Sequence, residues 1–379
     1  MAYYFLFPEK DATIYSHPDR TTMNTGGDEI LEIVKEKGSS DQRYYPSRVL
    51  IKFRDSEIQS VIENKIGTLS FSSSLQLLTT EHKNLSSILD LEVYAVSQSW
   101  NEGTGRFSNR PTGSNGTSWI YRDNNITATK WTTSSFGDGS TGSIDAVGIT
   151  EGGGVWYTGS NFQGSQQFLR GSNLDTNIDV TSIIQKFSAS LFASQTYPNG
   201  IENNGLIIKT PESTEQDTSS SFGEMKYFSV DTHTIYPPRL IFKWDDSTHN
   251  SQSLAKQSGD LSVSLYRNKE EYNQNAKATF RVHVRDRYPV RQFASSSNYL
   301  NPGYFTTASY YSIRDAHTEE EVIPFDTSYT KLSADSEGMY FKVFMDGLQP
   351  ERYYRILFKH TNNEGTTVYD NKYHFKVVR

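Results

Sequence analysis

Short runs in which apolar and polar residues alternate are the commonest pattern in this chain, and they predict strands. Typical examples are residues 30–35 (ILEIVK), 49–53 (VLIKF) and 91–96 (LEVYAV), which are rich in β-branched residues. Because such runs far outnumber stretches of helical period, we predict an all-β protein built from β-sandwiches. The other predicted strands are residues 12–14, 75–77, 205–209, 226–230, 239–244, 261–266, 278–284, 304–314, 339–345, 353–358 and 373–378.

Helical period occurs in two stretches of the sequence. In both, apolar residues recur every three or four positions, and an Asp, Ser or Thr that can cap the helix stands just before or at the start of the run. The two predicted helices, with their candidate N-caps, are residues 58–66 (Asp55 or Ser56) and 180–191 (Asp179 or Thr181).

Between residues 100 and 171 the composition changes to Gly, Ser, Thr and Asn with scattered tryptophans. A structureless loop of this length is uncommon inside a compact domain. We therefore expect short strands and long excursions anchored by aromatic side chains. Trp100 and Trp244 end predicted strands, so we assign both to the core.

The polar segment 245–260 contains no aromatic residue and divides the chain into two predicted domains. We place the first domain at residues 1–246, the linker at residues 247–260 and the second domain at residues 261–379.

The second domain contains the spacing Leu348-x-Pro350-x-x-x-Tyr354. This spacing predicts a tyrosine corner, in which the tyrosine hydroxyl bonds to the backbone of the preceding turn. Tyrosine corners are typical of immunoglobulin-like sandwiches, and we predict an Ig-like β-sandwich for this domain.

Composition narrows the classes of function. The 379 residues include no cysteine, which excludes disulfides, thiolate zinc sites and a cysteine nucleophile. The net charge of −7 argues against nucleic acid or an anionic membrane as a partner, because a polyanion would repel the chain. With no long apolar run and no secretion signal in residues 1–8, we expect no membrane insertion and synthesis in a reducing cytoplasm.

Residues 11–244 contain, in order, the motifs DATIY (from residue 11), NTGG (24), RVLIKF (48), WNEG (100), TSWIYRD (117), DVT (179), NNGL (203) and PPRL (237). This series resembles the DNRLRE-type jelly-roll domain, which is also grouped with carbohydrate-binding modules and disaggregatase-related repeats. The resemblance implies a jelly-roll β-sandwich for the first domain. The family's usual Asn-Asn-Ala-Pro stretch is present here only as Ser-Asn-Arg-Pro at residues 108–111.

As a whole, this cysteine-free, acidic β-protein resembles the virion structural proteins of large contractile-tailed marine phages, in which a jelly roll is followed by an Ig-like domain. The resemblance implies a structural component of the tail, baseplate or neck, located in the virion after synthesis in the host cytoplasm. It would act by protein–protein docking without catalysis or cofactor. Its partners would be other virion proteins, in a homo-oligomer or other symmetric assembly.

A glycan-binding adhesion protein that recognises host surface polysaccharide is the alternative, with a polysaccharide-degrading accessory protein as a third and more distant one. Aromatic rings in jelly-roll loops can stack on sugars, and Trp119, Tyr121, Arg122, Trp156 and Tyr157 have the matching chemistry. The competing interpretation of the tryptophans is that they fill the sandwich or anchor long loops.

Asp175, Asn177 and Asp179 have the D-x-N-x-D spacing of calcium ligands. Jelly rolls related to this family often hold a structural calcium, so these residues are candidate ligands. Val180 stands where an EF-hand loop needs glycine, and the alternative is that Asp179 caps the following helix.

The sequence Gly26-Gly-Asp-Glu29 spells most of a cyclic-dinucleotide synthase signature, but it precedes a predicted strand, so we interpret it as a turn. The sequence contains neither H-E-x-x-H nor G-x-S-x-G, and we expect no enzymatic activity.

Alternating tyrosines in residues 299–311 are candidates for a protein interface. An ordinary sandwich strand is an equally supported interpretation of this stretch. The candidate interface residues are Tyr299, Tyr304, Tyr310 and Tyr311.

Overall fold

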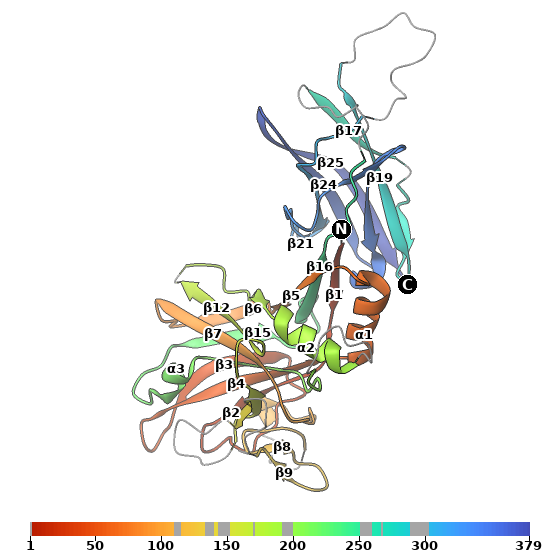
Figure 1. Cartoon of the computed structure of the whole chain (residues 1–379). Coiled ribbons are helices and arrows are strands. Elements are labelled where there is room, and N and C mark those ends of the chain that lie inside the picture. Colours follow the sequence, from red (N-terminus) through yellow and green to blue (C-terminus); the bar gives the residue numbers. More distant parts are fainter. Residues whose placement is uncertain are drawn as a thin grey trace, which may run out of the picture. The chain divides into compact units, whose positions relative to one another are not determined.

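The computed structural model describes residues 2–109, 115–132, 140–142, 152–169, 171–191, 200–250, 260–266, 268–288 and 303–379. Almost every element is a strand, and the paired strands are almost all antiparallel, so the predicted all-β sandwich class is confirmed (Figure 1).

The chain divides into two compact units. The larger unit comprises Leu6–Gly67 and Ser72–Ile241, and the smaller unit comprises Met1–Phe5, Thr68–Phe71 and Phe242–Arg379. The predicted linker includes residues 251–259, which lie outside the described residues, so its bounds stay a prediction.

An eight-stranded sheet forms most of the larger unit, with the order β12-β7-β14-β4-β3-β15-β6 and with β2 paired to β4. A four-stranded sheet has the order β1-β16-β5-β13. The division between the units runs through β1, β5 and β16. The strands of these sheets are β1 (Ala2–Leu6), β2 (Pro8–Tyr15), β3 (Ile30–Lys37), β4 (Tyr44–Phe53), β5 (Phe71–Gln76), β6 (Thr79–Lys83), β7 (Ile88–Ala95), β12 (Gln163–Leu169), β13 (Ile178–Asp179), β14 (Leu206–Lys209), β15 (Glu224–Phe228) and β16 (Arg239–Trp244).

Burial is continuous from Tyr45 to Ile51 in β4, so the inside–outside alternation of a one-sided sheet is lost there. The cause is the tryptophan-rich excursion between β7 and β12, which packs Trp119, Trp131 and Trp156 with Leu50 in one buried cluster. The predicted aromatic anchoring of this excursion is confirmed. Its short strands are β8 (Tyr121–Asp123), β9 (Thr129–Lys130), β10 (Ser140–Gly142) and β11 (Val155–Tyr157).

Both predicted helices are present, but the proposed cap of the first is wrong. The helix α1 (Asp55–Ser60) begins at Asp55, which puts Asp55 and Ser56 inside its first turn and leaves Arg54 as the N-cap, without a side-chain bond. The second helix, α2 (Thr181–Leu191), is capped as predicted, because Asp179 Oδ1 accepts a 2.8 Å hydrogen bond from the Thr181 N–H. The remaining helical elements of this unit are η1 (Val61–Ile66), η2 (Phe107–Asn109) and α3 (Glu212–Gln216).

The smaller unit is a sandwich of two sheets, with the orders β17-β19-β23-β22 and β18-β25-β24-β20-β21. Their inner faces meet through aromatic rings. Phe341 of β23 stacks on Tyr311 of β20 at 4.3 Å, and Phe280 of β19 lies 5.2 Å from Phe375 of β25. The elements are β17 (Leu261–Tyr266), β18 (Glu271–Asn273), β19 (Lys277–Asp286), β20 (Ser309–Asp315), β21 (Glu321–Ile323), β22 (Ser333–Asp335), β23 (Gly338–Phe344), η4 (Met345–Gly347), β24 (Tyr353–Asn362) and β25 (Gly365–Val378).

The tyrosine corner is confirmed. Tyr354 is buried at the start of β24, and its hydroxyl donates a 2.9 Å hydrogen bond to the carbonyl oxygen of Gln349 in the preceding turn. The bond fixes the path of the chain into β24 and stabilises the corner of the sandwich.

The Tyr354→Phe variant tests this bond, because it removes the hydroxyl and leaves the ring in place. We expect a loss of about 1 kcal/mol in the free energy of unfolding of the smaller unit, measured by urea denaturation. Tyr353→Phe is the matched control, since Tyr353 is adjacent and 46% exposed. Equal stability of the two variants would contradict the assigned role.

Candidate functional site

Two of the predicted carbohydrate-binding residues, Trp119 and Trp156, meet over the guanidinium of Arg48. The Arg48 Cζ lies 4.6 Å from the Trp119 ring centre and 5.1 Å from the Trp156 ring centre. Trp119 is 0% exposed and Trp156 is 9% exposed. Trp119 therefore presents no surface to a sugar, which agrees with the interpretation that these rings fill the core and anchor loops.

Arg48 is held in place by a buried carboxylate. Its Nε and Nη2 donate hydrogen bonds of 3.0 and 2.6 Å to the two carboxylate oxygens of Glu215 in α3, which makes a bidentate pair. Lys209 Nζ lies 3.4 Å from the same carboxylate, and the side chains of all three residues are no more than 3% exposed. Burial lowers the pKa of Lys209 against the opposing field of Glu215. We call Arg48, Glu215 and Lys209 the buried ion centre.

The tryptophan-rich excursion is tied to the buried ion centre by Gly153. Arg48 Nη1 donates a 2.6 Å hydrogen bond to the carbonyl oxygen of Gly153. Gly153 has a φ of +78°, and a Cβ there would lie 2.4 Å from Arg48 Nη1 and 2.7 Å from the Trp119 ring. A larger residue would separate the guanidinium from the ring, so glycine is required.

In the sequence, Arg48 stands out only as part of a strand motif, and neither Glu215 nor Lys209 is predicted to lie at a site. One signal was present: a lysine that ends the apolar strand GLIIK and a glutamate a few residues beyond it. The pairing of Glu215 with Arg48 joins residues 167 positions apart, which no local pattern reveals.

The Glu215→Gln variant would keep the shape of the side chain but remove the carboxylate that pairs with the buried Arg48, and it would leave Lys209 with only the carboxylate of Glu92, 3.8 Å away. We expect the larger unit to lose about 3–5 kcal/mol of stability, measured by thermal or urea unfolding, because breaking one side of a buried ion pair leaves uncompensated charge. Glu212→Gln, at an exposed position of the same helix, is the control and should stay near wild type. Similar losses for both variants would contradict this assignment.

The other predicted carbohydrate-binding residues contact different partners. Tyr121, Arg122 and Tyr157 are partly exposed. Arg122 Nη1 donates to the carbonyl oxygen of Ser99 at 2.8 Å, and the ring of Tyr157 lies 5.3 Å from that of Phe162.

Asn24 joins three segments of the larger unit. Its Nδ2 donates to the carbonyl oxygens of Glu102 and Thr117 at 2.6 and 2.8 Å, and its Oδ1 accepts from the Gly105 N–H at 2.7 Å. A Cβ on Gly103 would lie 2.4 Å from Asn24 Oδ1. The interpretation of residues 26–29 as a turn is confirmed, and these contacts show why the turn and the WNEG motif occur together.

Glu102 and Asp11 form a pair of acids beside this junction. Glu102 Oε1 accepts a 2.9 Å hydrogen bond from the Asp11 N–H, and Asp11 Oδ2 accepts one of 2.7 Å from the Val230 N–H. Burial, with a smaller effect of Asp231, raises the pKa of Glu102 to about 7, and burial raises that of Asp11 well above its usual value.

The raised pKa of Glu102 makes stability depend on pH. Because the folded state binds this proton more tightly than the unfolded chain does, the stability of the larger unit should fall as pH rises from about 4.5 to about 7. Glutamine at position 102 can still accept the Asp11 N–H but does not titrate. We therefore expect Glu102→Gln to reduce the stability difference between about pH 5 and about pH 8 by on the order of 1 kcal/mol, given solvent screening at this half-exposed site.

Urea unfolding at the two pH values measures this difference. Glu63→Gln, which removes an exposed carboxylate from η1, is the control. An unchanged pH dependence in Glu102→Gln would show that other groups are responsible for it.

Two of the three candidate calcium ligands, the carboxylates of Asp175 and Asp179, accept hydrogen bonds from the protein itself, whereas for Asn177 the bond is one of the backbone. Asp175 Oδ1 accepts a 2.8 Å hydrogen bond from the Thr79 N–H, and Asp179 Oδ1 caps α2 through Thr181. The Asn177 N–H donates to Gln166 Oε1. Within the described ranges, no group of three or more His, Cys, Asp or Glu side chains is placed to hold a metal ion.

Of the candidate interface tyrosines, Tyr299 lies outside the described residues. Tyr304 and Tyr311 are 3% and 1% exposed. Tyr311 lies in β20, as an ordinary sandwich strand would place it, whereas Tyr304 lies before that strand. Tyr310 is partly exposed, and its ring lies 5.2 Å from Lys359 Nζ.

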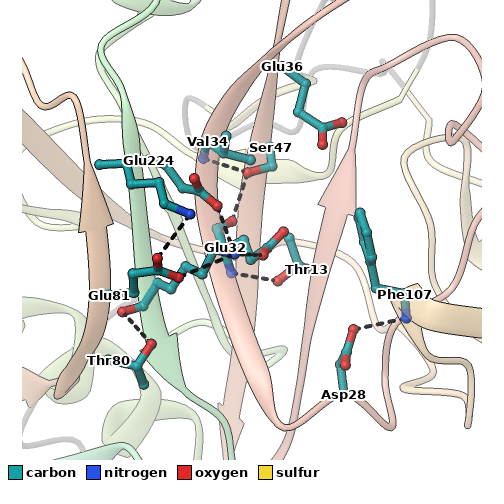
Figure 2. A network of polar contacts seen from close by, with 12 residues as sticks. Thr13, Asp28, Glu32, Val34, Glu36, Ser47, Thr80, Glu81, Phe107 and Glu224 are labelled. Atoms are coloured by element: carbon teal, nitrogen blue, oxygen red, sulfur yellow. Dashed lines mark hydrogen bonds and ion pairs between the residues drawn. The ribbon is translucent and has the colours of Figure 1, made fainter.

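The strands β3, β15 and β6 carry a row of charges at one end of the eight-stranded sheet (Figure 2). Lys226 Nζ lies 3.0 Å from a carboxylate oxygen of Glu32, 2.8 Å from one of Glu224 and 3.8 Å from one of Glu81. Burial acts to lower the pKa of Lys226, but hydrogen bonds with Glu224 and Glu32 raise it overall. We call these four residues the Lys226 row.

Near the Lys226 row, side-chain hydroxyls accept two backbone N–H groups of β3. The backbone pairing between β3 and β4 covers Lys35–Lys37, and beyond it the hydroxyls of Thr13 and Ser47 accept the N–H groups of Glu32 and Val34 at 3.0 and 2.9 Å (Figure 2). These bonds satisfy two backbone donors of β3 beyond its pairing with β4.

No family model matches the chain, and no curated protein matches it. Among solved structures it is similar to the crystal structure of the adhesin domain of Epf from Streptococcus pyogenes, with 7% sequence identity, 98% coverage of both chains and a TM-score of 0.18. A TM-score this low carries no argument about the fold or the function of this chain. None of the described helices is both long and apolar enough to span a membrane.

Proposed function

We propose that the protein is a structural component of a contractile-tailed phage virion, in the tail, baseplate or neck, and that it acts by docking to other virion proteins without catalysis. The observation that carries the proposal is the buried ion centre. Arg48, Glu215 and the two tryptophan rings have the chemistry of a ligand site, but in this protein they contact one another. They hold the tryptophan-rich excursion against the sheet, which makes the larger unit a rigid body suited to assembly.

We further propose that the larger unit is a DNRLRE-type jelly roll and the smaller unit an Ig-like domain. For the larger unit, the support is that the motif residues have structural contacts: Arg48 pairs with Glu215, and Asn24 joins the segment around Gly103. For the smaller unit, the support is the tyrosine corner of Tyr354.

Exposed aromatic residues on the smaller unit support docking to other proteins or to further copies of this chain. Tyr266, Tyr288 and Tyr353 are 56%, 79% and 46% exposed. Tyrosine is enriched in protein interfaces because it offers a large amphipathic contact area.

Quantitative proteomics of purified phage particles tests the proposal. We expect this chain at a fixed, stoichiometric copy number relative to known tail proteins, because a structural part is present in every particle in numbers set by symmetry. A chain found only in lysates of infected cells, and absent from washed particles, would contradict it.

A glycan-binding adhesion protein is the alternative proposal. Two of its five candidate residues, Trp119 and Trp156, are buried around Arg48. The other three, Tyr121, Arg122 and Tyr157, are partly exposed, so a glycan at this place would contact them rather than the two tryptophan rings.

A further inference from the structure

The outward face of one sheet in the smaller unit is rich in cations. Side chains of β19 alternate between the core and solvent, and Lys277, Arg281 and Arg285 occupy outward positions. The neighbouring strand β23 adds Lys342 at an outward position of its own. We call these four residues, on the sheet β17-β19-β23-β22, the basic face.

Tyrosines stand among the cations of the basic face. The pairing of the strands puts Tyr266 of β17 and Tyr340 of β23 on either side of Arg281. Tyr266 is 56% exposed. The centre of the Tyr340 ring lies 5.0 Å from Arg281 Cζ and 5.5 Å from Lys342 Nζ. Tyrosine beside arginine is a composition in which protein interfaces are enriched.

Part of the positive charge on the basic face has no counter-charge. Arg281 pairs with Asp335 at 2.6 Å and with Glu337 at 3.2 Å. Within the part of the chain that the structure describes, neither Arg285 nor Lys342 forms an ion pair. These two cations are therefore available to a partner.

A neighbouring histidine responds to this charge. Burial lowers the pKa of His283 in β19, and the positive charge of Arg285 lowers it further. The segments of the smaller unit that lie outside the described residues contain no acidic residue, so they add no negative charge to the basic face. Their charged residues are Lys256, Arg267 and Arg291.

The larger unit has the opposite charge. Residues 242–379, which hold every charged residue of the smaller unit, contain 18 Lys and Arg against 17 Asp and Glu. Residues 1–241 contain 19 Lys and Arg against 27 Asp and Glu. The parts of the larger unit outside the described residues hold only three of these acids and two of these cations, so the acidic surplus lies in the described residues.

Some of these acids gather on the outward side of β7 and at the start of α3. Asp90 and Glu92 occupy outward positions of β7, and Glu212 is the exposed first residue of α3. Burial raises the pKa of Tyr94, the next outward residue of β7, and negative charges that include Glu92 and Glu212 raise it further. We call Asp90, Glu92 and Glu212 the acidic row.

We propose that the basic face of one copy of this chain docks onto the acidic row of a second copy. Opposite charges on two surfaces attract the partners and set their orientation. Each copy carries both surfaces, so the contact is heterologous, and its repetition closes a ring or extends a filament. Nucleic acid is a poorer partner for the basic face, because the acidic larger unit would repel a polyanion.

Two charge-reversal variants of the full chain separate the two surfaces. The first variant, Arg285→Glu with Lys342→Glu, makes the basic face negative. The second variant, Asp90→Lys with Glu212→Lys, makes the acidic row positive. All four side chains are partly or fully exposed, and none belongs to the buried ion centre. Lys372→Glu is the matched control, because Lys372 is an exposed residue of β25 in the other sheet of the smaller unit.

Sedimentation velocity measures the self-association of each protein. We expect the wild-type chain to associate at about 50 mM salt and its association constant to fall by about tenfold or more at about 500 mM, because salt screens the attraction. Each variant alone should associate at least about tenfold more weakly than the wild type, and Lys372→Glu should stay within about twofold of it.

A mixture of the two variants tests the pairing itself. The second variant keeps the original basic face, and the first keeps the original acidic row, so these two surfaces can form the original contact. The two reversed surfaces are again opposite in charge. We therefore expect the equimolar mixture to recover association to within about threefold of the wild type, although neither variant associates alone.

Three results would overturn the proposal: a wild-type chain that stays monomeric up to about 100 μM, a variant that associates as strongly as the wild type, or a mixture that stays dissociated. Circular dichroism of each variant checks that lost association is not lost fold. The inference extends the docking proposed above, but it is tested on isolated protein. Its failure would leave the virion proposal standing, and absence of the chain from particles would not affect it.

Discussion

The larger unit depends on one buried interaction, the bidentate pair between Arg48 and Glu215. Removing a guanidinium and a carboxylate from water costs several kcal/mol each, and this cost is offset only where the geometry and the remaining hydrogen bonds are good. Here Glu215 also faces Lys209, and Arg48 also binds the carbonyl oxygen of Gly153. The pair thereby connects β4, α3, β14 and the tryptophan-rich excursion.

The Arg48–Glu215 pair explains why the aromatic residues of the excursion were ambiguous in the sequence. A tryptophan beside Arg, Asn and Gly has the chemistry of a sugar site, and it has equally the chemistry of a cation–π anchor. The difference lies in which face of β4 Arg48 occupies and in what covers that face, and both depend on contacts distant in sequence. The same holds for Tyr311: of the predicted strand 304–314, the structure has β20 (Ser309–Asp315), with Tyr304 outside it, and burial of Tyr311 is set by Phe341 in the facing sheet.

Most strands were predictable because a sheet face packed against a core imposes a period of two on the sequence. The strands that were missed lack this period for physical reasons. All five residues of β1 (AYYFL) are buried, and four of the five residues of β6 (TTEHK) are exposed. The tyrosine corner was predictable, because its partners lie within one turn. The cap of α1 was not, because Asp55 instead accepts a hydrogen bond from Asn203, 148 residues away.

The two edge strands of the eight-stranded sheet, β6 and β12, carry side chains that oppose pairing with a further strand. Unpaired edge strands tend to add a further strand, and proteins prevent this with charges and polar side chains on short edges. In β6, Glu81 and Lys83 form an ion pair at 2.9 Å, and Glu81 also faces Lys226. In β12 the exposed positions include Gln163 and Gln167. Asp175 also accepts the N–H of Thr79 at the start of β6, so both edges are poor templates for another strand.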